Sequence, residues 1–428
     1  MQTATGILEP TNAIASGCRR VLHVLDHSYP VMSGYSVRSR NLISTQRRLG
    51  FAPQVITGPL HEIDDPNSRD TTLDEVGYRR TPLQGISKRA ITLRWPVLRE
   101  LAVVRMFRRR ILDVLKSQSF DLVHAHSPAL CGLAAAQAAR AMNIPFVYEI
   151  RAFWEDAAVD QDKTRQQALR YKISRRLETH VAERADAVVG IARHILADLE
   201  GRGIAREKLF HISNGVDTER FVPLPRDQQL AAELGLDGVV LGFAGSLYNY
   251  EGVSWLVRAV AELRRRATHC HLLILGDGED VPAIRTAIQE CDAGSYVHFP
   301  GRVPHDQVQR YYSVMDIAVY PRKSIRLTEL VTPLKPLEAM SQAKAVLASG
   351  VGGIRELVDH EKSGLLFKPE DIEDFCSQAA RLIHDRGYRV ELGARARDTM
   401  CREKEWKVVA RQYSDVYEFA KGAAKKRS

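Results

Sequence analysis

The sequence from Pro333 to Gly350, PLKPLEAMSQAKAVLASG, predicts a short helix followed by a buried strand. Thr332 can cap this helix and Pro333 fits its first position. The backbone N–H groups of Leu334 and Lys335 would then point forward from the positive end of the helix dipole. The stretch therefore predicts an α/β unit with a place for a phosphate at the start of its helix.

Lys335 and Glu338 are three residues apart and therefore share a face of this helix. A cation for phosphate beside a carboxylate that accepts hydrogen bonds from sugar hydroxyls suits a nucleotide sugar. In an isolated segment, an ordinary ion pair on the surface of a capped helix is the simpler explanation. The rest of the sequence has to decide between the two.

The chain has 428 residues, which is too long for one typical core and predicts two domains. Neither a signal-peptide core nor an apolar run of membrane-spanning length is evident, so we expect a cytoplasmic protein. The six cysteines are scattered without a Cys-x-x-Cys pair, which indicates reduced thiols rather than a disulfide or zinc framework. They are Cys18, Cys131, Cys270, Cys291, Cys376 and Cys401.

The net charge of +9 is concentrated in two basic segments, between Arg79 and Arg110 and between Arg165 and Arg176. Apolar residues are interleaved in the first segment: Leu93, Trp95, Leu98, Leu101, Val104 and Phe107. Basic helices with such residues on their other face can lie on an anionic membrane, so a peripheral membrane contact is one prediction. A solvated face of a basic protein explains the pattern equally well. No nucleic-acid recognition motif is present, so we expect no nucleic-acid partner.

The chain repeats a strand–helix–strand pattern that is typical of a parallel sheet. In the first half, the predicted strands are 20–26, 54–57, 122–126, 146–150, 187–190 and 209–212, with helices at 37–49 and 130–142. After a charged connector, 224–237, strands are predicted at 239–244, 271–275, 296–299 and 317–320, with helices at 253–265, 281–288 and 305–312. A further amphipathic helix, 406–420, carries Val409, Tyr413 and Tyr417 on one face.

These elements predict two doubly wound, Rossmann-like α/β domains, residues 1–223 and 224–405. The C-terminal helix, 406–428, is expected to pack back toward the N-terminal domain. In such sheets, ligands bind at the carboxyl ends of the strands. The loops that leave those ends are 27–34, 151–156, 245–252, 277–280 and 322–335. We expect the two domains to face each other so that these loops meet in an interdomain cleft.

Six sequence blocks in this order resemble the family 4 glycosyltransferases of the GT-B fold over nearly the whole chain. They are Asn214-Gly-Val-Asp217 with Phe221 and Pro223, 272–278 (LLILGDG), 297–303 (VHFPGRV), 316–321 (DIAVYP), 337–340 (LEAM) and 352–358 (GGIRELV). More narrowly, 23–28 (HVLDHS), 33–35 (SGY), 151–155 (RAFWE) and 250–252 (YEG) resemble the subgroup associated with exosortase-A exopolysaccharide loci.

This resemblance implies a C-terminal domain that binds a nucleotide-diphosphate sugar and an N-terminal domain that presents a glycan or lipid-linked acceptor. It assigns Glu338 to the nucleotide ribose and the backbone near Arg302 and Val303 to the base. Gly34, and Gly245 in the loop after the first strand of the second domain, would allow close approach of the donor.

The sequence departs from the family at its charged positions. A second family glutamate is expected eight residues before Glu338, but Leu330 stands there and the nearest carboxylate, Glu329, is nine before. The family's arginine and lysine for the diphosphate fall on Ser246 and Glu251, which cannot neutralise it. Another cation must do so, because leaving-group charge needs a preorganised partner. The candidates are Arg322, Lys323, Arg326 and Lys335.

The family's histidine that faces the donor sugar falls on Arg151. A fixed guanidinium there could bind a carboxylate on the sugar, as in a uronic acid donor. A structural salt bridge to Glu155 or Asp156 is the alternative; these two acids are otherwise expected to be ordinary loop charges.

The resemblance implies a retaining transfer with no cofactor, in which the leaving diphosphate helps to take the acceptor proton. The sequence 277–280 (DGED) is expected to be a turn and not a metal site. The candidates for catalytic groups are Glu329, Arg151 and His27. His124 and His126 alternate on one strand, and we expect them to face opposite sides, so that one is a packing residue.

Two other kinds of protein remain possible at this point. A sugar-nucleotide epimerase or phosphorylase could share the two-domain fold, although the Asn214–Asp217 block argues against it. A non-catalytic nucleotide-sugar-binding scaffold of a polysaccharide assembly system would explain the altered charged positions.

Overall fold

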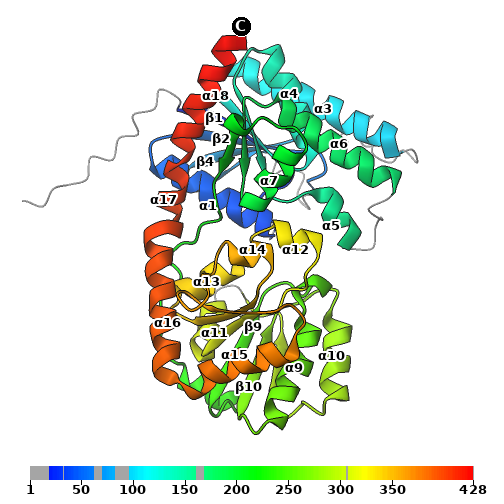
Figure 1. The fold of residues 1–428 in the computed structure, drawn as a ribbon. Helices are drawn as coiled ribbons and strands as arrows, with labels where there is room; N and C mark the ends of the chain where they lie inside the picture. The colour runs from blue at the N-terminus through cyan, green and yellow to red at the C-terminus, as the bar shows by residue number, and fades with distance from the viewer. Residues whose placement is uncertain are drawn as a thin grey trace, which may run out of the picture. The chain divides into compact units, whose positions relative to one another are not determined.

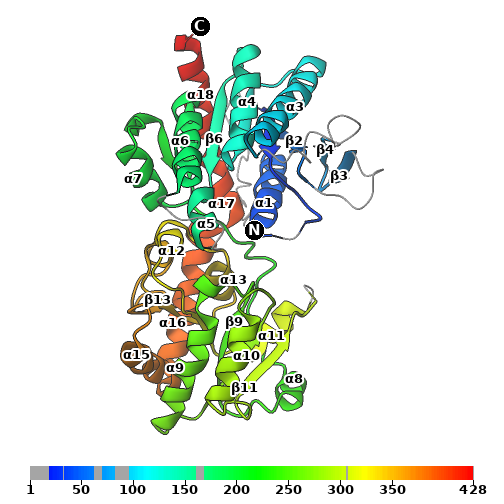
Figure 2. The same cartoon turned by 90° about the vertical axis from the view of Figure 1, so that its right-hand side faces the viewer.

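The computed structural model describes residues 19–31, 33–61, 70–81, 96–160, 168–304 and 307–427. The chain divides into two compact units. The first consists of Met1–Glu149, Val181–Val188 and Ala410–Ser428, and the second of Ile150–His180 and Val189–Val409. Figures 1 and 2 show that parallel-strand sheets with flanking helices form both parts of the chain, as the sequence predicts.

The first sheet has eight strands in the order β3-β4-β2-β1-β5-β6-β7-β8. Strand β3 is antiparallel to β4, while the pairs β4–β2, β2–β1, β1–β5 and β5–β6 are parallel. The bounds are β1 Arg20–Leu25, β2 Ala52–Thr57, β3 Asp70–Leu73, β4 Val76–Arg80, β5 Leu122–His126, β6 Phe146–Ile150, β7 Ala187–Gly190 and β8 Leu209–His211. Helices α1 (Gly34–Arg48) and α18 (Tyr413–Arg427) lie on one face, and α3 (Pro96–Ser117) and α4 (Ala129–Ala141) on the other (Figure 1).

The second sheet has six strands in the order β11-β10-β9-β12-β13-β14, and all of its pairs are parallel. The bounds are β9 Val239–Ala244, β10 Cys270–Leu275, β11 Val297–Gly301, β12 Ile317–Tyr320, β13 Ala345–Ser349 and β14 Leu365–Phe367. Helices α9 (Val253–Arg265) and α10 (Val281–Glu290) lie on one face, and α13 (Lys335–Ser341) and α16 (Arg386–Thr399) on the other (Figure 2).

The remaining helices complete the fold. They are α5 Trp154–Asp160, α6 Leu169–Arg184, α7 Arg193–Gly201, η1 Arg206–Lys208, α8 Gln228–Glu233, η2 Asn249–Glu251, α11 Val308–Val314, α12 Arg326–Leu330, α14 Gly352–Arg355, α15 Ile372–His384, η3 Met400–Lys404 and α17 Trp406–Arg411. Helix α12 lies within the segment 322–335 that was expected to be a loop.

Helix α1 begins at Gly34, three residues earlier than predicted, because a capping box closes its start. Ser33 Oγ accepts from the N–H of Ser36 (3.2 Å), and Ser36 Oγ accepts from the N–H of Ser33 (3.0 Å). The usual capping box carries Glu or Gln at its second position, so two serines at this spacing are a weaker sequence signal for the start of a helix. The predicted end of the helix at residue 49 is confirmed to within one residue, and the following Gly50 adopts a left-handed φ of +94°.

A buried polar network lies inside unit 1, on the face of the sheet that α1 and α18 cover. His23, His124, His126 and Glu149 are each 0% exposed. The prediction that His124 and His126 face opposite sides is wrong, because residues two apart on a strand share a face. Their rings stack with centroids 4.2 Å apart, and both approach Glu149, at 3.5 Å and 3.4 Å.

Two helices complete this network. From α1, Arg38 Nε donates to Glu149 Oε1 (3.1 Å), and Gln46 Oε1 lies 2.9 Å from His23 Nε2. From α18, the hydroxyl of Tyr413 donates to Glu149, and the hydroxyl of Tyr417 lies 2.9 Å from His124 Nδ1. The charge of Glu149 is therefore balanced within the core, as a buried carboxylate requires.

Helix α3 carries the first basic segment but turns part of its apolar surface inward. Val104 and Phe107 are 5% and 1% exposed, so the prediction that they belong to a membrane-facing side is wrong. Leu98 and Leu101 are more than half exposed. Leu93 and Trp95 lie outside the described residues. Across the described segments, no helix is both long enough and apolar enough to cross a membrane.

Candidate functional site

The loop that precedes α13 is held by the Asn214 side chain, and this corrects the predicted start of the helix. Thr332 is not the cap: its hydroxyl accepts from Asn214 Nδ2 (3.1 Å) and donates to the carbonyl of Ile191 (3.4 Å). Leu334 is the N-cap, and α13 starts at Lys335. The carbonyl of Leu334 accepts the first helical hydrogen bonds.

Lys335 extends from the first turn of α13 across the loop that follows β9. Its Nζ donates to Glu251 Oε1 (3.0 Å) and to the carbonyl of Ser246 (3.2 Å), and lies 4.9 Å from the centroid of the Phe243 ring. Gly245 has a φ of +151°, and a Cβ there would lie 2.1 Å from Lys335 Cε. Glycine at this position therefore leaves the room that the lysine side chain occupies.

Glu251 joins Lys335 to a second cation. Arg322 Nε lies 3.6 Å from Glu251 Oε2, and its Nη1 donates to the carbonyl of Val331 (3.0 Å). Burial raises the pKa of Glu251, but Lys335 and Arg322 outweigh this and hold it below its usual value. Within the described part of the chain, Arg322 Nε and Glu251 Oε2 have no hydrogen-bond partner.

Glu338 lies one turn after the start of α13, next to Lys335. Although its side chain is partly exposed, burial of its carboxyl raises its pKa to about 7, against the opposing effect of Arg220 and Lys335. A carboxyl with this pKa changes charge near neutral pH, so its capacity to accept hydrogen bonds from hydroxyls depends on pH.

Glu329 lies in α12, and its carboxylate bonds one residue of the preceding loop and one at the start of α14. Oε2 accepts from the N–H of Gly352 (2.7 Å) and Oε1 accepts from the Ser324 hydroxyl (2.6 Å). Leu330, at the position of the missing family glutamate, is buried. The Glu329 carboxylate is thus bound at the start of α14. Its catalytic role stays a prediction.

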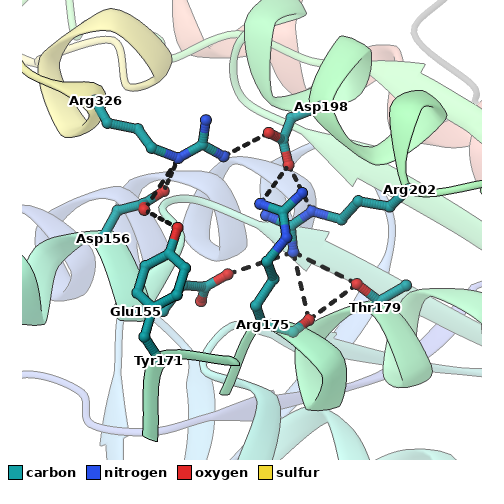
Figure 3. A network of polar contacts seen from close by, with 8 residues as sticks. All are labelled: Glu155, Asp156, Tyr171, Arg175, Thr179, Asp198, Arg202 and Arg326. Carbon is teal, nitrogen blue, oxygen red and sulfur yellow. Dashed lines mark hydrogen bonds and ion pairs between the residues drawn. The ribbon is translucent and has the colours of Figure 1, made fainter. Parts of the chain in front are cut away.

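Arg326 also lies in α12 but belongs to a different network, shown in Figure 3. Its Nε is 3.0 Å from both carboxylate oxygens of Asp156, and its Nη2 bonds Asp198 (Figure 3). Tyr171 donates its hydroxyl proton to Asp156 (2.8 Å). Two carboxylates therefore already neutralise Arg326.

The same network contains residues that the sequence did not single out. Arg202, which follows α7, lies 3.3 Å from Glu155, bonds Asp198 and places its guanidinium 4.0 Å from the Phe153 ring centroid. Asp198 and Arg202 are four residues apart, and this spacing is the sequence signal that could have predicted their ion pair. Glu155 and Asp156 are 3% and 2% exposed, so the expectation of ordinary loop charges is wrong.

The remaining predicted donor-side residues occupy separate places in unit 2. Arg151 is buried just after β6. Lys323 donates to the Asn249 side chain (2.6 Å). Arg302 and Val303 follow β11; Arg302 is exposed, and Val303 packs against the core. The structure thus brings Gly245, Arg322 and Lys335 together around Glu251, with Glu338 after Lys335 on α13 and Lys323 bonded to the neighbouring Asn249.

His27 and Gly34 lie in unit 1, at the carboxyl end of β1. His27 Nδ1 is 3.0 Å from Asp26 Oδ2, and its Nε2 is 2.8 Å from Ser33 Oγ. If Asp26 accepts the Nδ1 proton, Nε2 is a proton acceptor, which is the arrangement that a general base needs. Gly34 is the first residue of α1, next to the capping Ser33.

Two family models match the chain, one in its N-terminal part and one in its C-terminal part. Residues 32–220 match the model described as Glycosyltransferase Family 4, and residues 238–385 match Glycosyl transferases group 1. The chain therefore carries the paired domains of the GT-B glycosyltransferases.

Relatives and solved structures agree with this assignment. A GDP-mannose-dependent alpha-mannosyltransferase of Mycolicibacterium smegmatis is 26% identical, over 94% of this chain and 98% of its own length. A sucrose-phosphate synthase from Thermosynechococcus elongatus has a TM-score of 0.75 at 20% identity, with 94% and 98% of the two chains covered. HepE of Anabaena, solved with UDP-glucose, has a TM-score of 0.72 at 17% identity, with 93% and 99% covered. The chain is a glycosyltransferase of the hexosyltransferase class.

Proposed function

We propose that this glycosyltransferase takes a sugar from a nucleotide-diphosphate donor and transfers it, with retention, to a saccharide or lipid-linked acceptor. The observation that carries the proposal is the cluster at the carboxyl end of β9, where Lys335 lies over Gly245 and beside Glu338. A cation, a glycine loop and a carboxylate at a strand end suit a diphosphate with its attached ribose. The named relatives that use GDP-mannose, and HepE with UDP-glucose, support this donor class.

In this proposal, Lys335 takes the place of the cations that the family carries at positions 246 and 251. Glu251 holds its ammonium group at the loop, and Arg322 supports Glu251 from the other side. Arg326 and Lys323 are less suited, because Asp156, Asp198 and Asn249 already bind them. The Glu338 carboxylate accepts hydrogen bonds from the ribose hydroxyls. Arg302 and Val303 lie near the base.

The transfer proceeds by displacement on the same face of the sugar. The leaving diphosphate takes the acceptor proton, while the protein positions both substrates and stabilises the developing charge. In the first unit, His27 is arranged to accept a proton. No metal is needed in this scheme; turnover that persists in excess chelator supports this, and loss of turnover refutes it.

The product is an exopolysaccharide or another surface glycan, as the resemblance to the exosortase-A-associated subgroup implies, and the enzyme works in the cytoplasm. Exposed Leu98 and Leu101 among the arginines of α3 suit a peripheral contact with the inner face of an anionic membrane. Replacing Arg99, Arg105 and Arg109 with glutamine should weaken binding to anionic vesicles, and unchanged binding would exclude the contact.

The first test is a calorimetric screen of nucleotide sugars, with uronic acid donors included because of Arg151. A selective donor should bind wild type but not Glu338→Ala. It should also bind the control variant Glu290→Ala, which removes a surface carboxylate paired with Arg258. Nucleotide release that requires an acceptor would then establish transfer. Donor binding without turnover would favour the alternative, a non-catalytic scaffold, and no binding across the panel would contradict the donor site.

A further inference from the structure

A second cluster of ligating side chains lies at the opposite edge of the six-stranded sheet. Asp237 precedes β9, His269 precedes β10, and His271 is the second residue of β10. Strands β9 and β10 are parallel, so these residues lie at the amino ends of their strands, away from the carboxyl end that holds Lys335. The proposed donor site therefore does not use them.

The three side chains converge on one point. Asp237 Oδ1 is 2.6 Å from His271 Nε2 and 3.4 Å from His269 Nε2. One ligand atom from each residue lies within 4.8 Å of the other two. Ligands of a tetrahedral zinc ion, at about 2.0–2.2 Å from the metal, lie roughly 3.3 Å apart. Asp237 Oδ1 and His271 Nε2 are closer than this, so the Asp237 carboxylate would move away from His271 when an ion binds.

His271 is held in the orientation that a metal ligand requires. It is 4% exposed, and its Nδ1 lies 3.0 Å from His298 Nε2 on the neighbouring strand β11. A ring nitrogen that bonds a neighbour fixes the tautomer and leaves the other nitrogen to bind metal. His298 is thus the supporting partner of His271.

The other two ligands are open to solvent, so an ion can enter. The side chains of Asp237 and His269 are 82% and 57% exposed. Between Asp237 and β9, Gly238 has a φ of +96°, and a Cβ there would lie 3.2 Å from the His269 ring. Glycine therefore lets the backbone pass close to the ring and brings Asp237 alongside it.

We propose that Asp237, His269 and His271 bind one divalent transition-metal ion of the zinc type. Two imidazoles and a carboxylate give three protein ligands, and water completes the coordination. The ion joins the segment before β9 to the start of β10 and so stabilises the second unit. It takes no part in sugar transfer.

The test uses the full chain without an affinity tag, stripped of metal by a chelator and titrated with ZnCl2 at pH 8. Wild type should bind one equivalent, and its melting temperature should rise with zinc. Asp237→Asn and His269→Ala, both at exposed positions, should lose this binding and the rise in melting temperature. His298→Ala should bind about tenfold more weakly, because it removes only the supporting partner.

Two controls separate this site from other surface ligands. His384→Ala removes an exposed histidine on α15, and Cys401→Ser removes an exposed thiol; both should bind zinc as wild type does. Undiminished binding in Asp237→Asn and His269→Ala, or the same loss in His384→Ala, would overturn the proposal.

Discussion

Each unit contains a buried glutamate held by an arginine, and the two pairs differ in how completely they are closed. In unit 1, Glu149 is fully buried and takes Arg38 at 3.1 Å together with a tyrosine hydroxyl. In unit 2, Glu251 lies 3.6 Å from Arg322, too far for a hydrogen bond, and its other oxygen holds Lys335.

The accessibility of the cations separates the two sites further. Arg38 is 2% exposed, whereas the Lys335 side chain is 19% exposed. A buried ion pair that is closed on all sides mainly fixes the core, while one with a solvent-accessible cation keeps charge available for a ligand. We therefore expect mutations in the first pair to change stability and those in the second to change binding.

Breaking the first pair should have the largest effect. Arg38→Leu leaves the Glu149 charge buried without its arginine and should lower the free energy of unfolding of unit 1 by about 3–5 kcal/mol. Hydrogen exchange of the β5 and β6 amides would measure this change. The double variant Arg38→Leu/Glu149→Leu should recover part of the loss, because it removes both charges. A single variant as stable as wild type would contradict the closed-core interpretation.

Changing the Glu251–Lys335 pair of unit 2 should affect donor binding more than folding. Lys335→Met removes a charge-assisted contact worth about 1.5–3 kcal/mol, so donor affinity should fall roughly 10- to 150-fold. The double variant Glu251→Lys/Lys335→Glu returns a cation to the loop after β9. Calorimetry should show that it binds the donor better than Lys335→Glu alone; equal weakness would show that a cation at position 251 cannot take the place of Lys335.

The protonation of Glu338 should make stability and donor binding depend on pH in opposite directions. Its pKa of about 7 lies above its usual value of 4.5, so the folded state binds an extra proton between these values. The stability from this proton is present below pH 4.5 and is lost as pH rises to about 7. Donor affinity should change in the opposite sense and rise through pH 7, because the carboxylate accepts hydroxyl protons. Glu338→Gln should flatten both profiles, and an unchanged affinity profile in this variant would contradict the assignment.

The regular elements could be predicted from sequence because their signals are local. The strands Leu122–His126, Phe146–Ile150 and Val239–Ala244 have the predicted bounds, since each is a short apolar run between polar turns. The helix Val253–Arg265 also agrees, since its apolar residues recur at helical spacing.

The charged contacts could not be predicted, because their partners are distant in sequence. Glu251 and Lys335 are 84 residues apart, and Asp156 and Arg326 are 170 apart. Thr332 had the right residue type for a cap, but Asn214, 118 residues earlier, takes its hydroxyl. Local pattern identified these side chains as candidates, and only the fold assigned their partners.

The position of α18 has a consequence for synthesis of the chain. Tyr417, which bonds His124 in the core of unit 1, follows it by 293 residues. A ribosome must therefore translate the whole second unit before the polar interior of the first can close. We expect the nascent N-terminal part to remain incompletely packed during this time, with its histidines and Glu149 accessible to water, and therefore to depend on chaperones until translation has passed residue 417.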